Sequence, residues 1–185
     1  MAARRSDIAS QRITDTLAQA RVELPEPVGA VWIAWSAQGL VTLRWDEQGP
    51  LEGVKKARPP GEWTQALRAY ARGKGVDPAK EIPVELRGTA FQKAAWLALR
   101  AVPRGRVRTY AGIASDLGKP RAMRAVGAAN GANPIPIVVP CHRIVGAGLT
   151  LGGYSGGLDR KRGLLQLEGV KLDKDHLLPG QLALF

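Results

Sequence analysis

Residues 110–143 read YAGIASDLGKPRAMRAVGAANGANPIPIVVPCHR. Residues 110–117 and 121–130 have the composition of two helices, and residues 118–120 (Gly-Lys-Pro) form a tight turn between them, because glycine and proline both interrupt helices. The pattern predicts a helix-turn-helix unit. The last part, residues 135–143, is an apolar run that ends in Pro-Cys-His-Arg. A buried segment is therefore expected to lead directly into a cysteine and a histidine.

The second of these helices carries basic and small residues on different faces. Arg121 and Arg124 are three residues apart, a spacing that lets two guanidinium groups reach phosphates or a groove. Small side chains recur at positions i, i+3, i+4 and i+7: Ala122, Ala125, Val126 and Ala129. The stripe has two interpretations, because small side chains permit either close packing on the first helix or close approach of a partner. We expect Val126 to belong to the core.

Cys141 is the only cysteine of the chain, and His142 follows it directly. A lone thiol beside a potential base is a candidate nucleophile, although a free cysteine is also commonly a small buried apolar group. Because a free thiol has a pKa of about 8.5, attack on an alkyl carbon needs a base or an electropositive setting. Neighbours on a strand point to opposite faces, so contact between these two side chains requires a turn or a bridging water molecule.

The chain has 185 residues, enough for one or two small domains, and a formal net charge of +11. The charge favours a polyanionic partner, because each phosphate that Lys or Arg neutralises releases counterions; solubility alone is the alternative explanation. A single cysteine excludes an intrachain disulfide and a multi-cysteine zinc site, and we expect no metal and no cofactor. The chain lacks an apolar run of about 18 residues, and its N-terminus does not resemble a signal peptide. A cytoplasmic protein without membrane attachment is expected.

The first half of the chain has local patterns of its own. Residues 7–21 have the apolar spacing of an amphipathic helix that ends before Pro25. Residues 28–35 and 40–45 are rich in Val, Trp, Ile and Leu and flank a short segment that ends in glycine, which predicts a β-hairpin. Residues 62–72 have helical spacing again. A small antiparallel sheet flanked by a helix is the expected result.

We therefore predict an α+β fold, α/β in the broad sense, with two domains and a tail. Residues 1–83 form the sheet-and-helix domain. Residues 84–170 form a mostly helical domain that contains the helix-turn-helix, and Thr89 caps its first helix. Residues 171–185 are a tail that packs in part through its leucines.

Several groups of residues in the second half follow the pattern of one protein family, in the same order along the chain. They are Gly88 to Gln92 with Trp96, Arg121 to Gly127, Asn133 to Arg143, Gly153 to Gly157, and Leu164 to Gly169. In these motifs the chain resembles the O6-alkylguanine-DNA alkyltransferases, suicide proteins that repair alkylated guanine. The N-terminal arm matches no motif of that family.

The resemblance implies direct-reversal DNA repair, in which Cys141 irreversibly takes the alkyl group of O6-alkylguanine in a single turnover. It also implies that Glu168 orients His142 and that His142 acts on the thiol through water, a relay similar in logic to a hydrolase triad. The residues alone would make Glu168 a solvated charge at a helix end. Asn133 precedes proline, as is typical of an Asx turn, and matches the asparagine that braces the cysteine segment in the family. Arg143 is expected to form a structural ion pair instead of touching the substrate.

The resemblance further implies that a monomer binds double-stranded DNA through the minor groove, associates with the nucleoid when bound, and flips the damaged guanine out of the stack. Arg124 would fill the place that the guanine leaves. Tyr110 would press on the target phosphate and donate a proton to the base. The guanine pocket would be lined by Tyr154, Ser155 and Gly156. The other expected DNA contacts lie on the helix of Arg124: Arg121, Ala122, Ala125 and Gly127.

Three alternative functions compete with repair. A non-catalytic alkyltransferase-like lesion sensor would bind the same DNA, but such relatives typically have tryptophan at the position of Cys141. A helix-turn-helix DNA-binding regulator would use Arg121 and Arg124 and leave the cysteine, histidine and glutamate without a role. A cysteine hydrolase is the weakest alternative, because an adjacent Cys and His are not the usual spacing of its nucleophile and base.

Overall fold

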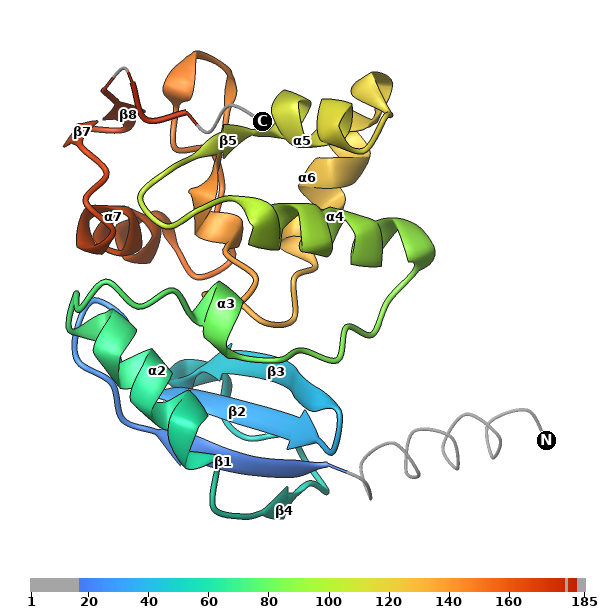
Figure 1. Ribbon diagram of the computed structural model, residues 1–185, viewed down its shortest axis with the longest axis vertical. Helices are drawn as coiled ribbons and strands as arrows, with labels where there is room; N and C mark the ends of the chain where they lie inside the picture. Colours follow the sequence, from blue (N-terminus) through green and yellow to red (C-terminus); the bar gives the residue numbers. More distant parts are fainter. Residues whose placement is uncertain (1–16, 179, 183–185) are drawn as a thin grey trace.

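The computed structural model describes residues 17–178 and 180–182. The first half of the chain is a four-stranded sheet with the strand order β3-β2-β1-β4, and helix α2 lies against it (Figure 1). β2 pairs in antiparallel register with both β1 and β3, whereas β4 runs parallel to β1. The strands are β1 Ala18–Val22, β2 Val31–Ser36, β3 Gly39–Trp45 and β4 Lys55–Lys56.

The β-hairpin predicted from the sequence is confirmed as β2 and β3, whose last pair is Ser36 with Gly39. Gly39 has a φ of +144°, and a Cβ at this position would lie 2.8 Å from the carbonyl oxygen of Pro83. Glycine is therefore required at this turn, because a side chain would meet backbone atoms. The same close approach lets Val84 form an isolated parallel bridge with Leu40.

The helix expected over residues 7–21 is wrong where it can be compared, because Ala18–Val22 is strand β1. The part of that expectation over residues 1–16 lies outside the described residues. Nonlocal interactions outweigh the helical spacing: every residue of β1 pairs with β2, and the Gln19 side chain donates to the carbonyls of Leu51 and Val54, each at 2.8 Å. The spacing of apolar residues along the chain predicts neither of these two interactions.

Two helices follow the sheet. α2 (Gly61–Ala71) agrees with the helix predicted for this segment, and it buries Trp63, Leu67 and Tyr70. The short helix α3 (Pro78–Glu81) then lies between the sheet and the helices of the second half (Figure 1). The apolar face of α2 therefore covers the sheet.

The second half is mostly helical. α4 (Ala90–Ala101) starts at Thr89, whose hydroxyl accepts from the backbone N of Gln92 at 3.2 Å, while Gln92 Oε1 accepts from the backbone N of Thr89 at 2.9 Å. The predicted cap is confirmed and is a full capping box. α5 (Tyr110–Asp116) and α6 (Met123–Gly131) provide the predicted helix, turn and helix.

The remaining elements connect these helices to the tail. A parallel pair of β5 and β6 joins the start of the helix-turn-helix to the residues after Cys141. The tail forms a small hairpin that buries Leu177 and leaves Leu178 exposed. The bounds are β5 Arg108–Thr109, β6 Ile144–Val145, α7 Leu158–Leu167, β7 Leu172–Asp173, β8 His176–Leu177, η1 Asp46–Gln48, η2 Pro120–Ala122, η3 Cys141–Arg143 and η4 Ala147–Leu149.

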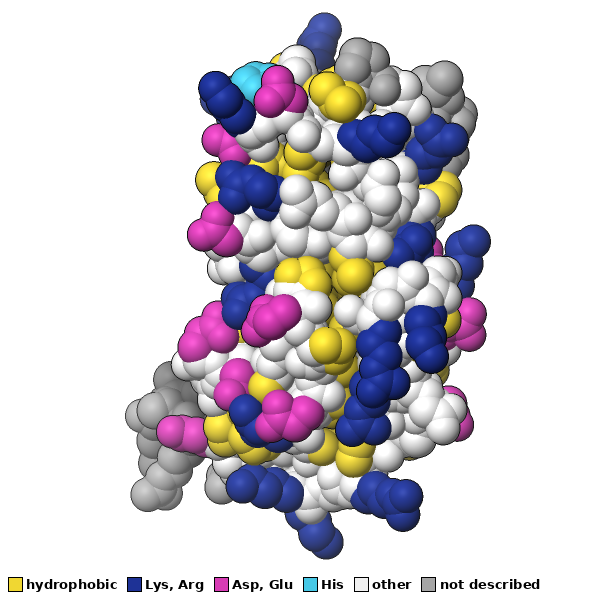
Figure 2. Space-filling model, turned by 90° about the vertical axis from the view of Figure 1, so that its left-hand side faces the viewer, with side chains coloured by type: hydrophobic (Ala, Val, Ile, Leu, Met, Phe, Trp, Pro, Cys, Tyr) yellow, Lys and Arg dark blue, Asp and Glu magenta, His cyan; other side chains and the backbone are white. Residues whose placement is uncertain are grey.

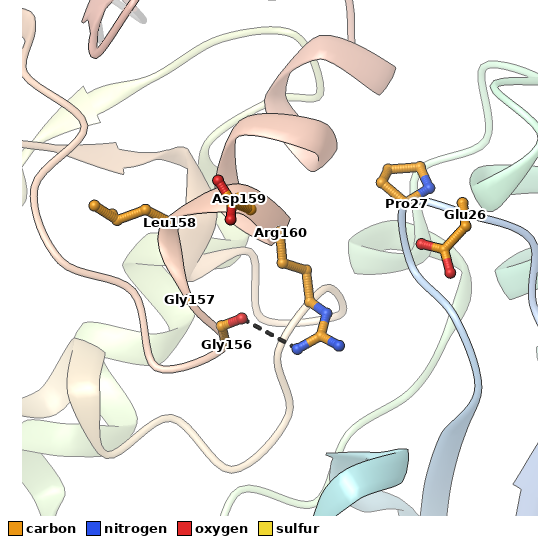
Figure 3. A pocket seen from close by; sticks show the side chains of 7 residues that line it. All are labelled: Glu26, Pro27, Gly156, Gly157, Leu158, Asp159 and Arg160. Atoms are coloured by element: carbon orange, nitrogen blue, oxygen red, sulfur yellow. Dashed lines mark hydrogen bonds between the residues drawn. The ribbon is translucent and has the colours of Figure 1, made fainter.

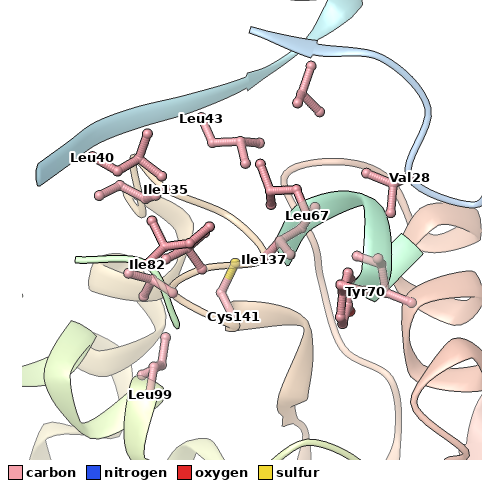
Figure 4. Close-up of a cluster of buried hydrophobic side chains, with 14 of the residues drawn as sticks. Val28, Leu40, Leu43, Leu67, Tyr70, Ile82, Leu99, Ile135, Ile137 and Cys141 are labelled. Carbon is pink, nitrogen blue, oxygen red and sulfur yellow. The ribbon is translucent and has the colours of Figure 1, made fainter. Parts of the chain in front are cut away.

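One apolar cluster joins the two halves. Ile33 and Leu67 from the first half and Leu99 and Ile137 from the second belong to the same group of buried side chains, part of which Figure 4 shows. Residues on both sides of the boundary predicted near residue 83 thus share a core. Among the described residues, no helix is long and apolar enough to span a bilayer.

Candidate active site

Cys141 is the first residue of η3, and only 1% of its surface is exposed. Figure 4 shows its sulfur among buried apolar side chains of the shared core. Asn133 braces the segment before it, because its Nδ2 donates to the carbonyl of Val139 at 2.8 Å and its Oδ1 accepts from the backbone N of Ile135 at 3.0 Å. This is the Asx turn that the sequence predicts, and it fixes the backbone that leads to the thiol.

The same segment contains a strained residue. Ile137 has a φ of +73°, a region that β-branched residues rarely enter. Strain of this kind persists only where the surroundings over-determine the conformation, and here Ile135, Ile137, Val138 and Val139 are all fully buried. Core packing and the Asn133 brace together hold the chain in the shape that presents Cys141.

The thiol is protonated at rest. Burial raises the pKa of Cys141 to about 11, although Asn133, Lys161 and Tyr154 act in the opposite direction. At neutral pH the thiolate is therefore a minor species, and the nucleophile must form by loss of a proton during the reaction. A nearby base is the chemical requirement that follows.

His142 and Glu168 meet in the interior. His142 Nε2 lies 2.8 Å from Glu168 Oε1, and both side chains are inaccessible to solvent. Glu168 caps the C-terminus of α7, where the residues alone would place a solvated charge, but only 5% of the residue is exposed. Burial opposes its ionisation, yet His142 and Arg143 outweigh this effect and hold the pKa of Glu168 well below its usual range. The carboxylate is therefore ionised.

This carboxylate determines which imidazole nitrogen carries the proton. An ionised carboxylate only accepts, so Nε2 of His142 is the donor and Nδ1 keeps its lone pair. Burial lowers the pKa of His142, which keeps the ring neutral. Within the described part of the chain, Nδ1 is buried without a hydrogen-bond partner. A free basic nitrogen thus lies in the same interior as the Cys141 thiol.

Three more groups donate to Glu168, and the site residues predicted from the sequence include none of them. Arg143 donates from Nε to Oε2 and from Nη2 to Oε1, each at 2.9 Å. It also donates to Asp77 at 2.8 Å, so the structural ion pair expected of Arg143 is present. The backbone N of Gly105 donates to Oε2 at 3.1 Å. Tyr70, on α2 of the first half, donates to Oε1 at 2.8 Å.

Lys161 is a second buried group absent from the sequence-based set. Burial lowers its pKa to about 8, and its positive charge favours the thiolate of Cys141. Helical spacing could have revealed its position, because it precedes the buried Leu164 and Leu165 by three and four residues. The ammonium group donates to the backbone carbonyls of Ile144 at 2.6 Å, Gly153 at 3.4 Å, and Leu151.

Two tyrosines approach the thiol from different elements. Tyr110 begins α5, and its hydroxyl accepts from Asn130 Nδ2 at 3.4 Å. The Tyr154 hydroxyl is buried and has no hydrogen-bond partner of ordinary geometry among the described residues. Burial first, and the neighbouring Cys141 second, raise the pKa of both tyrosines. Both hydroxyls therefore stay protonated and can donate.

The loop of residues 154–157 contacts Trp45 of the first half and Arg160 of α7. Trp45, at the end of β3, meets the Tyr154 ring edge-on with centroids 6.4 Å apart. Arg160 lies over the Trp45 ring at 4.2 Å and donates to the carbonyl of Gly156 at 3.1 Å (Figure 3). A Cβ at Gly156 would lie 2.7 Å from Trp45 Nε1, so the loop packs too closely on the indole for any side chain there.

Two pockets adjoin this loop. One, of about 280 Å³, lies between β3 and the segment around Asn133, and Ser155 is part of its wall. The other, of about 400 Å³, lies between Glu26-Pro27 and the start of α7, and Gly156 lines it (Figure 3). Ser155 and Gly156, predicted to line one guanine pocket, thus line two separate pockets.

The stripe of small residues on α6 divides between core and surface. Packing accounts for Val126 and Ala129, which are buried, and Trp96 Nε1 donates to the carbonyl of Ala129 at 2.8 Å. A Cβ at Gly127 would meet nothing within 4 Å, so the fold does not require glycine there. The predicted DNA-contacting residues are all accessible: Arg121, Arg124 and Ala125 are exposed, and Ala122 and Gly127 are partly exposed.

Basic side chains occur over both halves of the molecule. On the face seen in Figure 2, several of them gather in the lower half, beside a group of acidic side chains. At the helix-turn-helix, residues 119–122 line a further pocket of about 490 Å³, and Lys119 and Arg121 contribute to it. This region combines positive charge with little side-chain bulk, which suits contact with a phosphate backbone.

Relatives of known function match most of the chain. Residues 90–170 match the family model of the DNA-binding domain of 6-O-methylguanine DNA methyltransferase. The methylated-DNA–protein-cysteine methyltransferase of Mycobacterium tuberculosis is 42% identical over 159 residues, which is 84% of this chain and 95% of the relative. The protein of the same name from Methanosarcina acetivorans is 41% identical over 155 residues, with 77% and 94% covered.

Solved structures are similar over both halves. The crystal structure of Mycobacterium tuberculosis OGT in complex with DNA has a TM-score of 0.71 and 40% identity, covering 82% of this chain and 92% of that one. O6-methylguanine-DNA methyltransferase from Pyrococcus kodakaraensis has a TM-score of 0.58 and 29% identity, covering 83% and 99%. The α+β fold class predicted from the sequence is confirmed.

Proposed function

The chain belongs to the family of methylated-DNA–protein-cysteine methyltransferases, and we propose that Cys141 is the residue that accepts the alkyl group of O6-alkylguanine. The reaction is direct reversal of DNA alkylation. Because the product is a stable thioether on the protein itself, each molecule acts once. The observation that carries the assignment is the buried set of Cys141, His142 and Glu168, in which an ionised carboxylate leaves His142 Nδ1 free to act as a base.

The reaction begins with a proton transfer. The proton of Cys141 Sγ passes through one water molecule to Nδ1 of His142, and Glu168 stabilises the imidazolium that forms. The thiolate then attacks the alkyl carbon in line with the bond to O6. The carbon–sulfur bond forms as the carbon–oxygen bond breaks, and the electron pair of the broken bond stays on guanine. Tyr110 donates a proton to the departing base and regains one from solvent. His142 releases to solvent the proton that it took from the thiol.

The remaining predicted residues hold the substrate. Tyr154, Ser155 and Gly156 form the wall beside the flipped guanine, and Asn133 fixes the segment that presents the thiol. The second helix of the helix-turn-helix lies in the minor groove, where Arg124 occupies the space that the guanine leaves. The other contacts of that helix are Arg121, Ala122, Ala125 and Gly127. The protein acts as a cytoplasmic monomer on lesion-containing duplex DNA.

Two binding-only alternatives account for less of the structure. A lesion sensor has no need of a cysteine held beside a base, and a transcriptional regulator would use the helix-turn-helix alone. Neither explains why His142 and Glu168, both inaccessible, are paired next to a buried thiol. The repair function uses all of these groups.

Intact-protein mass spectrometry with an O6-methylguanine oligonucleotide tests the assignment. We expect one added methyl group, about 14 Da, on Cys141 and no turnover beyond one equivalent. The Cys141→Ala variant should gain no mass and still bind lesion DNA, because the helix-turn-helix surface is unchanged. Multiple turnovers, or a folded protein without an adduct, would contradict the proposal.

A further inference from the structure

Tyr70 brings a hydroxyl group from the first half of the chain into the buried ion network of the second half. The residue lies on the buried face of α2 and is fully inaccessible. Its hydroxyl donates to Glu168 Oε1 at 2.8 Å and lies 3.4 Å from His142 Nε2. Together with the 2.8 Å contact of His142 Nε2 to the same oxygen, the three atoms form a closed triangle.

The triangle involves Glu168 Oε1, the carboxylate oxygen that Tyr70, His142 and Arg143 all contact. Arg143 grips both oxygens of Glu168 and takes Oε1 from Nη2 at 2.9 Å. A bidentate guanidinium is a geometry that suits a carboxylate, so Arg143 fixes the plane of the Glu168 carboxylate. The Tyr70 hydroxyl contacts Oε1 next to His142, and therefore favours the orientation in which this oxygen faces the imidazole.

We propose that Tyr70 is a positioning residue for alkyl transfer: its hydroxyl holds Glu168 Oε1 against His142 Nε2 and so keeps His142 in the tautomer whose Nδ1 is the base. This inference rests on the proposed function, since it concerns the same proton transfer. Burial and the adjacent Glu168 charge raise the pKa of Tyr70, so the hydroxyl remains a donor throughout. The first half of the chain thus takes part in the chemistry and does not only support the fold.

A purely structural Tyr70 would act through its ring, which packs in the shared core. The Tyr70→Phe variant separates the two roles because it keeps the ring and removes the hydroxyl. We expect its single-turnover rate on a saturating O6-methylguanine duplex to fall about tenfold, the size of effect that loss of one hydrogen bond to a charged group produces. The DNA concentration that gives the half-maximal rate should not change. The rate of the variant should begin to rise at a higher pH than the rate of the wild-type protein.

Thr64→Val is the matched control. Thr64 is also buried on α2, but its hydroxyl donates to the carbonyl of Gly61 within its own helix. The control should keep the wild-type rate and pH profile. A comparable loss in Thr64→Val would mean that α2 responds to any lost hydroxyl, and would overturn the proposal.

A double-mutant cycle decides whether Tyr70 acts through His142. Residues that act as one unit are non-additive, so Tyr70→Phe should change the rate less than about twofold in a His142→Ala background. An equal loss in both backgrounds, or no loss in the wild-type background, overturns the proposal. If Tyr70→Phe is inactive while the wild-type protein is active, the loss supports the proposal only when the variant is folded and its His142 tautomer has changed. An inactive variant with an unchanged tautomer overturns the proposal.

Nitrogen NMR of the histidine rings gives that tautomer without any reaction. The chain has two histidines, and a His176→Asn variant assigns their signals. His142 should be protonated at Nε2 alone in the wild-type protein and should show a mixture of tautomers in Tyr70→Phe. An unchanged tautomer overturns the role of Tyr70. If the wild-type protein transfers no methyl group, the proposed function itself fails, whatever the NMR spectra show.

Discussion

The burial of Cys141 makes its reactivity conditional on a base. With a pKa of about 11 the group is a thiol at neutral pH, so random electrophiles meet a weak nucleophile. The thiolate forms only by local proton transfer. His142 offers a free Nδ1 as the base, and the positive charge of Lys161 favours the thiolate. This arrangement suits a protein that acts once, because a premature modification would inactivate it.

A relay of Glu168, His142 and Cys141 predicts that the first two residues act as one unit. Glu168→Gln and His142→Ala should each lower the rate of methyl transfer by about a hundredfold, the usual contribution of a general base. Each should also move the rise of the rate to higher pH, because the thiol then has to lose its proton to solvent instead of to His142. The double variant should be little slower than the slower single variant.

The measurement is the pH dependence of transfer from an O6-methylguanine duplex in the four proteins. Circular dichroism must first show that each is folded, since Glu168→Gln weakens the pairing of the buried Arg143. Strictly additive losses would mean two independent roles. An unchanged pH profile in Glu168→Gln would remove this residue from the relay.

At the scale of the elements, the loop before α7 is positioned by contacts from outside its own sequence. Trp45 from β3 and Arg160 from the first turn of α7 hold Tyr154 and Gly156 between them. Lys161 fixes the neighbouring carbonyl of Gly153. A loop that local sequence leaves free is therefore kept in one shape by two packed elements, as we expect of the binding wall that we propose it forms.

On the exposed face of α6, replacing Arg124 should lower the rate of methyl transfer by an amount that depends on whether the substrate is duplex DNA or a free base. Arg124→Ala should slow methyl transfer from duplex DNA by about tenfold or more, because unstacking a base costs a few kcal/mol that Arg124 helps to offset. Transfer from free O6-benzylguanine should change little, since no stack has to be opened. Single-turnover assays on both substrates measure the difference.

Arg72→Ala is the matched control, because Arg72 is an exposed arginine at the end of α2, away from the helix-turn-helix. It should leave both rates nearly unchanged. Equal losses on both substrates for Arg124→Ala would show that Arg124 supports the fold or the pocket.

At the scale of the whole molecule, buried charges connect the two halves. Asp77 and Tyr70 from the first half meet Arg143, His142 and Glu168 from the second. Removing one partner of a buried ion pair commonly costs about 3–5 kcal/mol, because the other charge remains buried without compensation. The proposed site is therefore also a structural joint, and its state of ionisation contributes to the stability of the fold.

That linkage predicts a pH dependence of unfolding. Burial lowers the pKa of His142 in the folded protein, whereas the unfolded chain has a pKa of about 6.5 at this residue. Below that value the unfolded state binds the proton more readily, so stability should fall by about 1 kcal/mol between pH 7 and pH 5.5. The lowered pKa of Glu168 also stabilises the folded protein. This contribution is fully present above the pKa that Glu168 has in the unfolded chain, and it is lost only in stronger acid.

Urea unfolding at both pH values, compared between the wild-type protein and His142→Asn, isolates the contribution of this residue. The variant should lose the drop between pH 7 and pH 5.5 and keep the loss in stronger acid. The same drop in the variant would mean that other groups cause it.

Residue patterns along the chain correctly predict the elements whose signals are local. The Thr89 cap, the β2–β3 hairpin, and the helix, turn and helix of residues 110–130 are each predicted by residue patterns within one short stretch of the chain. The Asx turn of Asn133 is equally local. Cys141 and His142 are adjacent and indicated a nucleophile and a base by themselves. Glu168 came instead from a resemblance to a family, because no spacing rule links it to His142.

Other features depend on contacts between residues that are far apart in the chain, and these appear only in the folded structure. Ala18–Val22 is a strand because β2 pairs with it, in spite of its helical spacing. Glu168 is buried and ionised because His142 and Arg143 surround it, and Tyr70 reaches the same carboxylate from the other half. The physical reason is common to all three cases: burial and hydrogen bonding across the fold are free-energy terms that exist only once remote segments have packed together.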